Sequence, residues 1–257
     1  MIFSNALQAL YERILRSQCT HVPRHIAIIQ DGNRRFAQNH GITRADGHRA
    51  GADTTEMMLD WANELGIRHI TLYCFSTENF SRDYEEVKEL IDLIRDRLIK
   101  AIKDRRIHRN QIRLQVLGDR TLLPDDLRVC VEEAERATAG YQNHFINLAL
   151  AYGGRNEIVR AARELVQKVQ EGSLEPEDID AAMVEKHLDG GRKIPPVDLI
   201  IRTGNERRTS NFLPWFANGN ECAVYFCAPN WPSFRKIDLL RAIRVYDQRI
   251  CLKRETG

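Results

Sequence analysis

Six short runs rich in apolar residues recur along the chain, and stretches with a helical repeat separate them. Runs such as Ile26–Ile29 and Ile70–Phe75 are apolar at nearly every position rather than at alternate positions. Strands of this kind are buried on both faces, which is typical of parallel sheets covered by helices. The alternation therefore predicts an α/β fold with a six-stranded, mainly parallel sheet and helices on both faces.

The same pattern sets the expected element boundaries. Strands are predicted at His25–Gln30, His69–Ser76, Gln111–Gly118, Phe145–Tyr152, Asp198–Thr203 and Glu221–Phe226. Helices are predicted at Ala45–Leu65, Tyr84–Arg105, Asp125–Ala139, Asn156–Gln170, Pro176–His187 and Lys236–Gln248. Because no linker or low-complexity stretch interrupts the 257 residues, we expect one domain over residues 1–257.

Residues 1–20 are expected to hold a further, amphipathic helix, since apolar residues recur there every three to four positions. Two interpretations remain open for its apolar face. It packs on the domain or on a partner subunit, or it rests on a membrane surface.

Composition and charge exclude several classes of protein. The 38 Lys and Arg residues, 30 of them Arg, are interleaved with 36 Asp and Glu, so no nucleic-acid partner is expected. The 6 Cys residues form no C-x-x-C pair, which indicates a reducing compartment rather than a disulfide framework or a zinc site. Because the sequence shows neither a signal peptide nor an apolar run of about 18 residues, we expect a cytoplasmic protein.

Four of the predicted strands end in segments that combine Gly, Asn, Ser or Thr, and Arg: Asp31–Arg35, Ser76–Arg82, Gly153–Glu157 and Arg202–Phe212. Ligands of open α/β sheets bind beyond the carboxyl ends of the strands, and these residue types bind phosphate. The chain contains neither a G-x-x-x-x-G-K-[ST] loop nor a G-x-G-x-x-G turn. A phosphate ligand other than an ordinary nucleotide is therefore predicted.

Asp31 has two interpretations from its position alone. It caps the helix that is expected to begin near Gly32, or it holds a divalent cation against a diphosphate. The neighbouring Arg34 and Arg35 favour the cation, because guanidinium groups bind diphosphate oxygens.

Several motifs occur in a fixed order over residues 24–226: HIAIIQDGNRRFA, GHRAG, LYCFSTENFSR, NLALAYGGRNEIV, DLIIRTGNERRTSNFLPW and ECAVYF. Together they resemble the cis-prenyltransferases, the undecaprenyl diphosphate synthase family. The D-D-x-x-D motif of the unrelated trans-prenyltransferases is absent. Arg34 stands where many bacterial members have Gly, so the chain is more similar to the archaeal and eukaryotic branch.

The resemblance implies an Mg²⁺-dependent, homodimeric transferase with a hydrophobic tunnel for its product. Such an enzyme adds isopentenyl diphosphate repeatedly to an allylic diphosphate, either farnesyl or geranylgeranyl diphosphate, and makes a long-chain polyprenyl diphosphate that serves as a glycosyl carrier precursor. Peripheral membrane contact through the product and the N-terminal helix is expected. Two other functions remain open from the residues: a non-catalytic subunit of such an enzyme, and a sugar-phosphate or polyphosphate-binding protein.

The resemblance also implies the site residues. Asp31 is the expected catalytic residue and metal ligand, and Glu221 is the second metal ligand. The expected allylic diphosphate contacts are Gly32, Asn33, Arg34, Arg35, Arg44 and His48, and Phe36 is expected beside the isoprenoid chain. The second loop contributes Ser76, Thr77, Glu78, Asn79, Phe80 and Arg82. Arg202, Arg208, Thr209 and Ser210 match the isopentenyl diphosphate site. Asn79 is the family's usual candidate for proton removal, but an amide is a weak base, so we expect it to position the substrate while a diphosphate oxygen takes the proton.

Overall fold

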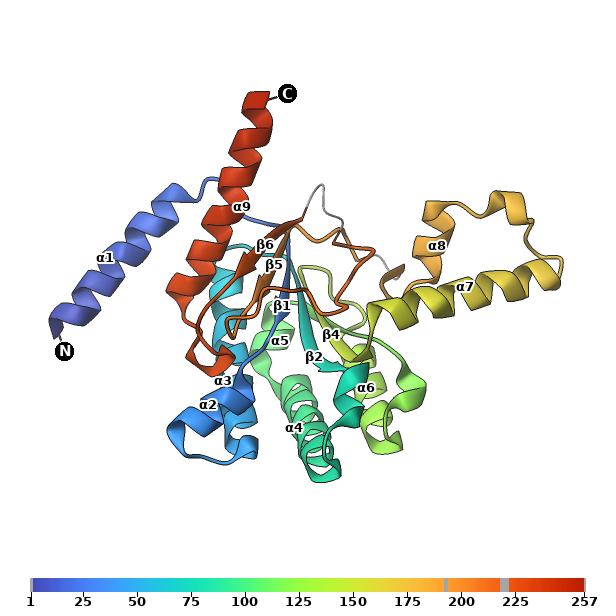
Figure 1. The fold of residues 1–257 in the computed structure, drawn as a ribbon, viewed down its shortest axis with the longest axis horizontal. Coiled ribbons are helices and arrows are strands. Elements are labelled where there is room, and N and C mark those ends of the chain that lie inside the picture. Colours follow the sequence, from blue (N-terminus) through green and yellow to red (C-terminus); the bar gives the residue numbers. More distant parts are fainter. Residues whose placement is uncertain (1, 192–193, 218–221, 257) are drawn as a thin grey trace. The chain divides into compact units, whose positions relative to one another are not determined.

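The structure, a computed structural model, describes residues 2–191, 194–217 and 222–256 (Figure 1). Six strands form one sheet in the order β3-β4-β2-β1-β5-β6, and the pairings β1–β5, β3–β4 and β5–β6 are parallel. The predicted α/β fold with a six-stranded parallel sheet is confirmed. The product tunnel stays a prediction. None of the described helices is long and apolar enough to cross a membrane.

The strands are β1 (His25–Ile29), β2 (His69–Ser76), β3 (Ile112–Leu117), β4 (His144–Tyr152), β5 (Leu199–Arg202) and β6 (Ala223–Phe226). The α-helices are α1 (Ile2–Gln18), α2 (Asn33–His40), α3 (Arg44–Glu64), α4 (Tyr84–Lys103), α5 (Arg105–Arg109), α6 (Asp125–Thr138), α7 (Gly154–Gln170), α8 (Ala181–His187) and α9 (Lys236–Thr256). A 3₁₀ helix, η1, spans Thr77–Ser81, and shorter 3₁₀ turns lie at 120–122, 176–178, 189–191 and 231–233.

One predicted helix is divided in the structure, and another is followed by a short helix that was not predicted. The helix predicted at Tyr84–Arg105 ends at Lys103, and the additional helix α5 begins because the Asp104 carboxylate accepts a hydrogen bond from the backbone N–H of Arg106 at 2.8 Å. The helix predicted at Pro176–His187 is divided, since Asp180 caps α8 by accepting from the N–H of Met183 at 2.7 Å and only a 3₁₀ turn precedes it. Helix α9 extends beyond the predicted end at Gln248.

The chain forms two compact units, and we describe each by itself. The first contains residues 1–71, 197–208 and 219–257, and the second contains residues 72–196 and 209–218. The expectation of one domain over residues 1–257 therefore stays a prediction. In the first unit β1 is buried along its whole length and pairs with β5 in parallel register, from Ile26 opposite Leu199 to Ile29 opposite Arg202. In the second unit β3 pairs with β4, and α6 packs on both β3 and α4.

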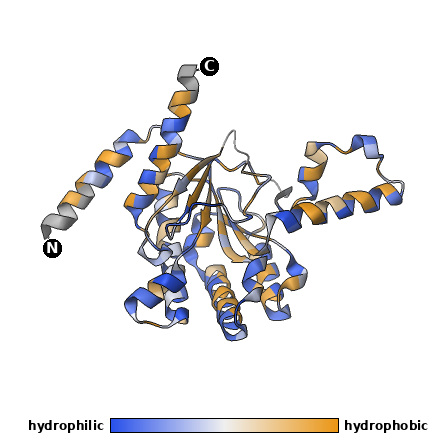
Figure 2. Ribbon diagram, in the orientation of Figure 1, coloured by the Kyte–Doolittle hydropathy of each residue, from blue (hydrophilic) through white to orange (hydrophobic). Residues whose placement is uncertain are grey.

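Helix α1 packs on α9 within the first unit. Leu15 is fully buried in a cluster with Ile237 and Leu240, and Leu65 packs against this cluster. The coloured part of α1 carries both hydrophobic and hydrophilic residues, in agreement with the predicted amphipathic helix (Figure 2). Packing on its own unit is thus confirmed for one side of the helix, whereas Leu7, Leu10 and Ile14 are exposed.

Candidate active site

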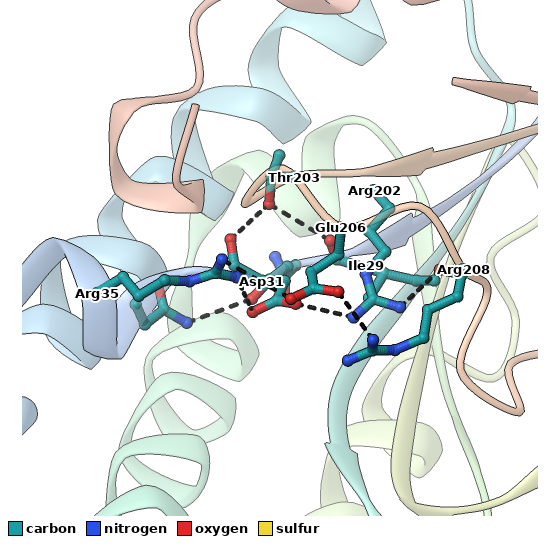
Figure 3. A network of polar contacts seen from close by, with 9 residues as sticks. Ile29, Asp31, Arg35, Arg202, Thr203, Glu206 and Arg208 are labelled. Carbon is teal, nitrogen blue, oxygen red and sulfur yellow. Dashed lines mark hydrogen bonds and ion pairs between the residues drawn. The ribbon is translucent and has the colours of Figure 1, made fainter. Parts of the chain in front are cut away.

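Asp31 lies two residues beyond the last residue of β1, at the centre of a cluster of charged side chains (Figure 3). Its Oδ1 accepts a hydrogen bond from Nη2 of Arg35 at 3.2 Å, and its Oδ2 accepts one from Nη2 of Arg202 at 2.9 Å. The carboxylate keeps 30% of its surface exposed, whereas the Arg202 side chain keeps 5%. A ligand can therefore reach the Asp31 carboxylate, while the buried guanidinium of Arg202 holds it in position.

The main chain of Asp31 is fixed by two other segments. Its carbonyl oxygen accepts hydrogen bonds from the Thr203 hydroxyl at 2.7 Å and from the backbone N–H of Trp231 at 2.9 Å. Thr203 follows β5 directly, and Trp231 comes after β6. Neighbouring strands of the sheet thus hold the position from which the Asp31 carboxylate projects.

Gly32, rather than Asp31, is the N-cap residue of α2, so the interpretation of Asp31 as the helix cap is wrong. Gly32 has φ 109° and no side chain to bond the first N–H groups of α2. A Cβ at this position would lie 2.5 Å from Oδ1 and 2.8 Å from Cα of Asn230. The glycine is required both by its backbone conformation and by this close approach. The result is a helix N-terminus beside Asp31, a favourable position for an anion.

Arg202 and the segment after it complete the cluster. Nη1 of Arg202 donates to the carbonyl oxygen of Arg208 at 2.6 Å, so its guanidinium joins the Asp31 carboxylate to the following loop. Glu206 pairs with Arg208 at 2.9 Å and with Arg35 at 3.8 Å. We call Asp31, Arg35, Arg202, Glu206 and Arg208 the Asp31 cluster. The cluster is net positive, because it contains three guanidinium groups and two carboxylates.

The other predicted contacts around α2 have more varied surroundings. The Asn33 amide donates to the Gln30 carbonyl at 3.4 Å. Its Oδ1 lies so close to Gly51 that a Cβ on this glycine would be only 2.2 Å away. Phe36 stacks on His40 with ring centroids 4.1 Å apart. Of the remaining expected residues, the structure leaves Arg34 and Arg44 exposed and buries His48, and Glu221 lies outside the described residues.

In the second unit the predicted loop after β2 is the 3₁₀ helix η1, closed by a reciprocal capping box. The Asn79 Oδ1 accepts from the backbone N–H of Ser76 at 3.0 Å, while the Ser76 side chain accepts from the backbone N–H of Asn79. Two flanking residues are also engaged: Phe80 meets Phe75 edge to face at 4.8 Å, and Arg82 pairs with the buried Glu86 at 3.1 Å.

Glu78 bonds two neighbouring side chains. It accepts hydrogen bonds from the Thr77 hydroxyl and from the Asn211 amide, both at 3.2 Å. Partial burial raises the pKa of Glu78, but hydrogen bonds from its own backbone N–H and from Asn211, Ser76 and Thr77 outweigh it, so the pKa lies below its ordinary value. Glu78 is therefore a carboxylate that its neighbours hold in place.

Asn211 occupies the N-terminus of α7, where the sequence suggested a phosphate-binding loop. The N–H of Gly154 donates to the Asn211 carbonyl at 2.9 Å, and the N–H of Arg155 donates to its Oδ1 at 2.8 Å. These N–H groups bind the Thr209–Asn211 segment instead of remaining open to a ligand. Expected isopentenyl diphosphate contacts lie in that segment, where Thr209 is exposed and Ser210 has a φ of 49°.

Comparisons with known proteins agree with this arrangement. Residues 29–254 match the family model described as "Putative undecaprenyl diphosphate synthase". The chain is 48% identical to the geranylgeranyl-diphosphate-specific tritrans,polycis-undecaprenyl-diphosphate synthase of Halobacterium salinarum, over 98% of this chain and 83% of that protein. It is also 48% identical to the Archaeoglobus fulgidus protein of the same name, over 93% of this chain and 96% of that protein.

Solved structures are similar as well. Lavandulyl diphosphate synthase from Lavandula x intermedia, in complex with dimethylallyl diphosphate, superposes with a TM-score of 0.82 at 36% identity, over 88% of this chain and 95% of that chain. A probable undecaprenyl diphosphate synthase from Campylobacter jejuni gives a TM-score of 0.70 at 29% identity, over 88% and 96%. With sequence, fold and the acidic and basic strand ends in agreement, the chain belongs to the undecaprenyl diphosphate synthase family of prenyl-transferring enzymes.

Proposed function

We propose that this chain is a cis-prenyltransferase that condenses isopentenyl diphosphate repeatedly onto geranylgeranyl diphosphate and releases a long-chain polyprenyl diphosphate. The Asp31 cluster carries the proposal, because it offers three guanidinium groups and a reachable carboxylate beside a helix N-terminus. Geranylgeranyl diphosphate is preferred over farnesyl diphosphate as the starter because the archaeal relatives are named as specific for it.

We assign the allylic diphosphate to the N-terminus of α2. The first N–H groups of a helix have no partner within the helix, and here the N-cap is a glycine without a side chain to occupy them. Arg35 adds a guanidinium that keeps 43% of its surface exposed and already contacts Asp31. Donors fixed in this way stabilise the negative charge that grows on the diphosphate as the allylic C–O bond breaks.

The residues present fit a magnesium ion. Mg²⁺ is typically held by one or two carboxylates together with substrate phosphate oxygens, and Asp31 offers a carboxylate with 30% of its surface exposed. Asp31 would hold the ion, and Glu221 stays the expected second ligand. When bound, magnesium supplies further neutralisation of charge on the departing diphosphate. Arg202 contributes separately, because its buried guanidinium sets the orientation of the Asp31 carboxylate.

We assign isopentenyl diphosphate to Arg208. This side chain is 68% exposed, and it pairs with Glu206, which also pairs with Arg35. A diphosphate bound to Arg208 or to Arg35 would compete with Glu206 for that guanidinium group and replace it as the ionic partner. Sequence inspection did not single out Glu206, although its position within the segment Asn205–Arg208 between basic residues was a usable signal.

Replacing Arg208 with alanine is expected to raise KM for isopentenyl diphosphate about 10- to 100-fold, the loss of one charge-assisted contact, with a smaller change in kcat. Arg207→Ala is the matched control, because Arg207 is an adjacent, exposed arginine. Steady-state kinetics with the starter at saturation measure both parameters. An unchanged KM in the Arg208 variant would contradict the assignment.

Asn79 is assigned a positioning role. Its amide oxygen already accepts the Ser76 N–H, which closes η1 and fixes the neighbouring Glu78. An oxygen engaged in this way, on an amide of negligible basicity, is unsuited to accept the proton of the reaction. A diphosphate oxygen of the substrate is the proposed acceptor.

This role predicts a difference between two Asn79 variants. Asn79→Asp keeps the oxygen that accepts the Ser76 N–H, so kcat should stay within about tenfold of the wild-type value. Asn79→Ala removes that oxygen and should lower kcat by about 10- to 100-fold. If the two variants were equally impaired in steady-state turnover, the amide NH₂ rather than the cap would be the important group.

The assembly and location are proposed at the level of the family. We expect a homodimer in the cytoplasm that contacts the membrane peripherally through its product and α1. The exposed Leu7, Leu10 and Ile14 on α1 support the membrane contact. Co-sedimentation with anionic vesicles, compared between the full chain and a Leu10→Glu variant, tests it.

Incorporation of labelled isopentenyl diphosphate into butanol-extractable lipid tests the function as a whole. With magnesium, geranylgeranyl diphosphate should be used with a higher kcat/KM than farnesyl diphosphate, and chromatography of the products gives the chain length. A lack of incorporation with either starter would favour the non-catalytic subunit or the sugar-phosphate-binding protein instead.

A further inference from the structure

Three side chains of the types that bind metals lie close together in the first unit, on segments that the proposed reaction does not use. They are His21, in the connection between α1 and β1, and Asp247 and Cys251, one turn apart on α9. One ligand atom from each lies within 4.8 Å of the other two. His21 and Asp247 are 226 residues apart in sequence, so the fold rather than local spacing brings them together. The absence of a C-x-x-C pair, which led us to expect no zinc site, therefore does not bear on this group.

The geometry at Asp247 is already organised around one oxygen. Oδ1 accepts hydrogen bonds from the Thr20 hydroxyl at 2.9 Å, the His21 backbone N–H at 2.7 Å and Nδ1 of His21 at 2.6 Å. The Asp247 side chain keeps 8% of its surface exposed and that of His21 keeps 29%. A largely buried carboxylate thus lies close to an imidazole and a thiol.

The ligand types select the metal. Thiolate, imidazole and carboxylate together are a zinc donor set, whereas Mg²⁺ prefers oxygen ligands. Tetrahedral zinc with bonds of about 2.0 to 2.3 Å holds its ligand atoms about 3.3 to 3.6 Å apart. The three ligand atoms lie within 4.8 Å of one another, and Nδ1 of His21 is 2.6 Å from Oδ1 of Asp247. Zinc therefore requires this hydrogen-bonded pair to open and the thiol to approach, which movements of about 1 Å by the side-chain ends would achieve.

We propose that His21, Asp247 and Cys251 form a zinc site with water as the fourth ligand, which fastens the segment after α1 to α9. On binding, the Cys251 thiol releases its proton to solvent. The Nδ1 proton of His21, which is hydrogen-bonded to Asp247, is exchanged through solvent, so that the neutral imidazole carries its proton on Nε2 and Nδ1 bonds the metal. The site joins the segment after α1 to α9. Leu15, Ile237 and Leu240 already bring these two helices together. Its role is structural and independent of the proposed reaction.

Direct metal binding to the purified full chain tests the proposal. Equilibrium dialysis against zinc in the presence of excess magnesium should leave one zinc per chain, and cobalt in its place should give a thiolate-to-metal charge-transfer band in the near ultraviolet. Cys251→Ser should remove that band, and both Cys251→Ser and His21→Gln should weaken zinc binding by more than the roughly 10- to 100-fold that loss of an outer-shell partner costs. Zinc should raise the thermal midpoint of the wild type but not of either variant.

Cys19→Ser is the matched control. Cys19 is another partly exposed thiol of the same region, but its Sγ donates to the Leu240 carbonyl at 3.8 Å and it is not part of the three-ligand group. It should bind zinc as the wild type does, and unfolding without zinc should confirm that the variants are folded. Absence of zinc from the dialysed wild type, or equal loss of zinc in the Cys19 and Cys251 variants, would overturn the site.

Discussion

Replacing Asp31 with asparagine is expected to lower kcat for isopentenyl diphosphate incorporation by about a thousandfold or more, which corresponds to roughly 4 kcal/mol of barrier. The substitution keeps the size and one oxygen of the side chain but removes the charge that holds magnesium in the proposed mechanism. It also removes the ionic partner of the buried Arg202 and of Arg35. Steady-state turnover at saturating magnesium, compared with binding of the starter alone, measures the loss.

Two further variants separate the chemical role of Asp31 from its structural one. Asp31→Ala leaves the Arg202 guanidinium, only 5% exposed, without this partner and should lower the free energy of unfolding by about 1 to 2 kcal/mol, less than for a fully buried pair because Asp31 is 30% exposed. Asp178→Ala removes an exposed carboxylate on the 3₁₀ turn at 176–178 and should change neither turnover nor the free energy of unfolding. Turnover of the asparagine variant within tenfold of the wild type would exclude the metal-binding role.

The strands could be predicted closely because burial on both faces leaves an unbroken apolar run; β2 begins and ends at the predicted residues. Helix ends were less predictable, since they depend on individual caps. Asp104 starts α5, a short helix that the helical repeat had not indicated, and α9 continues past Gln248. Local periodicity shows that a helix exists, whereas a single side-chain hydrogen bond decides where it ends.

The site was predictable where its residues are close in sequence. Asp31 and Arg35 stand four residues apart, and the structure joins them directly. Their long-range partners were harder to predict, because a pairing over 171 residues, as between Asp31 and Arg202, leaves no local pattern. Asn211 shows the same limit: nothing near it in sequence reveals that it occupies the N-terminus of α7.

Glycine 32 should tolerate no side chain, and Gly32→Ala is expected to reduce both stability and catalysis. An alanine Cβ would lie 2.8 Å from the Asn230 Cα, and the next residue, Trp231, is bonded through its N–H to the Asp31 carbonyl. Relief of the clash must therefore move either that segment or the N-terminus of α2. We expect the free energy of unfolding to fall by about 2 to 4 kcal/mol and kcat/KM to fall about a hundredfold.

The other end of the same helix supplies the control. Gly41 also has a left-handed backbone, with φ +64°, but a Cβ there would meet no atom within 4 Å. Gly41→Ala thus includes only the conformational cost, about 1 to 2 kcal/mol, and should leave kcat/KM near the wild-type value. Urea unfolding and steady-state kinetics of both variants give the difference between them. If Gly32→Ala lost no more stability and activity than Gly41→Ala, the close approach to Asn230 would not be what positions the N–H groups of α2, and their proposed role in binding the allylic diphosphate would lose its structural basis.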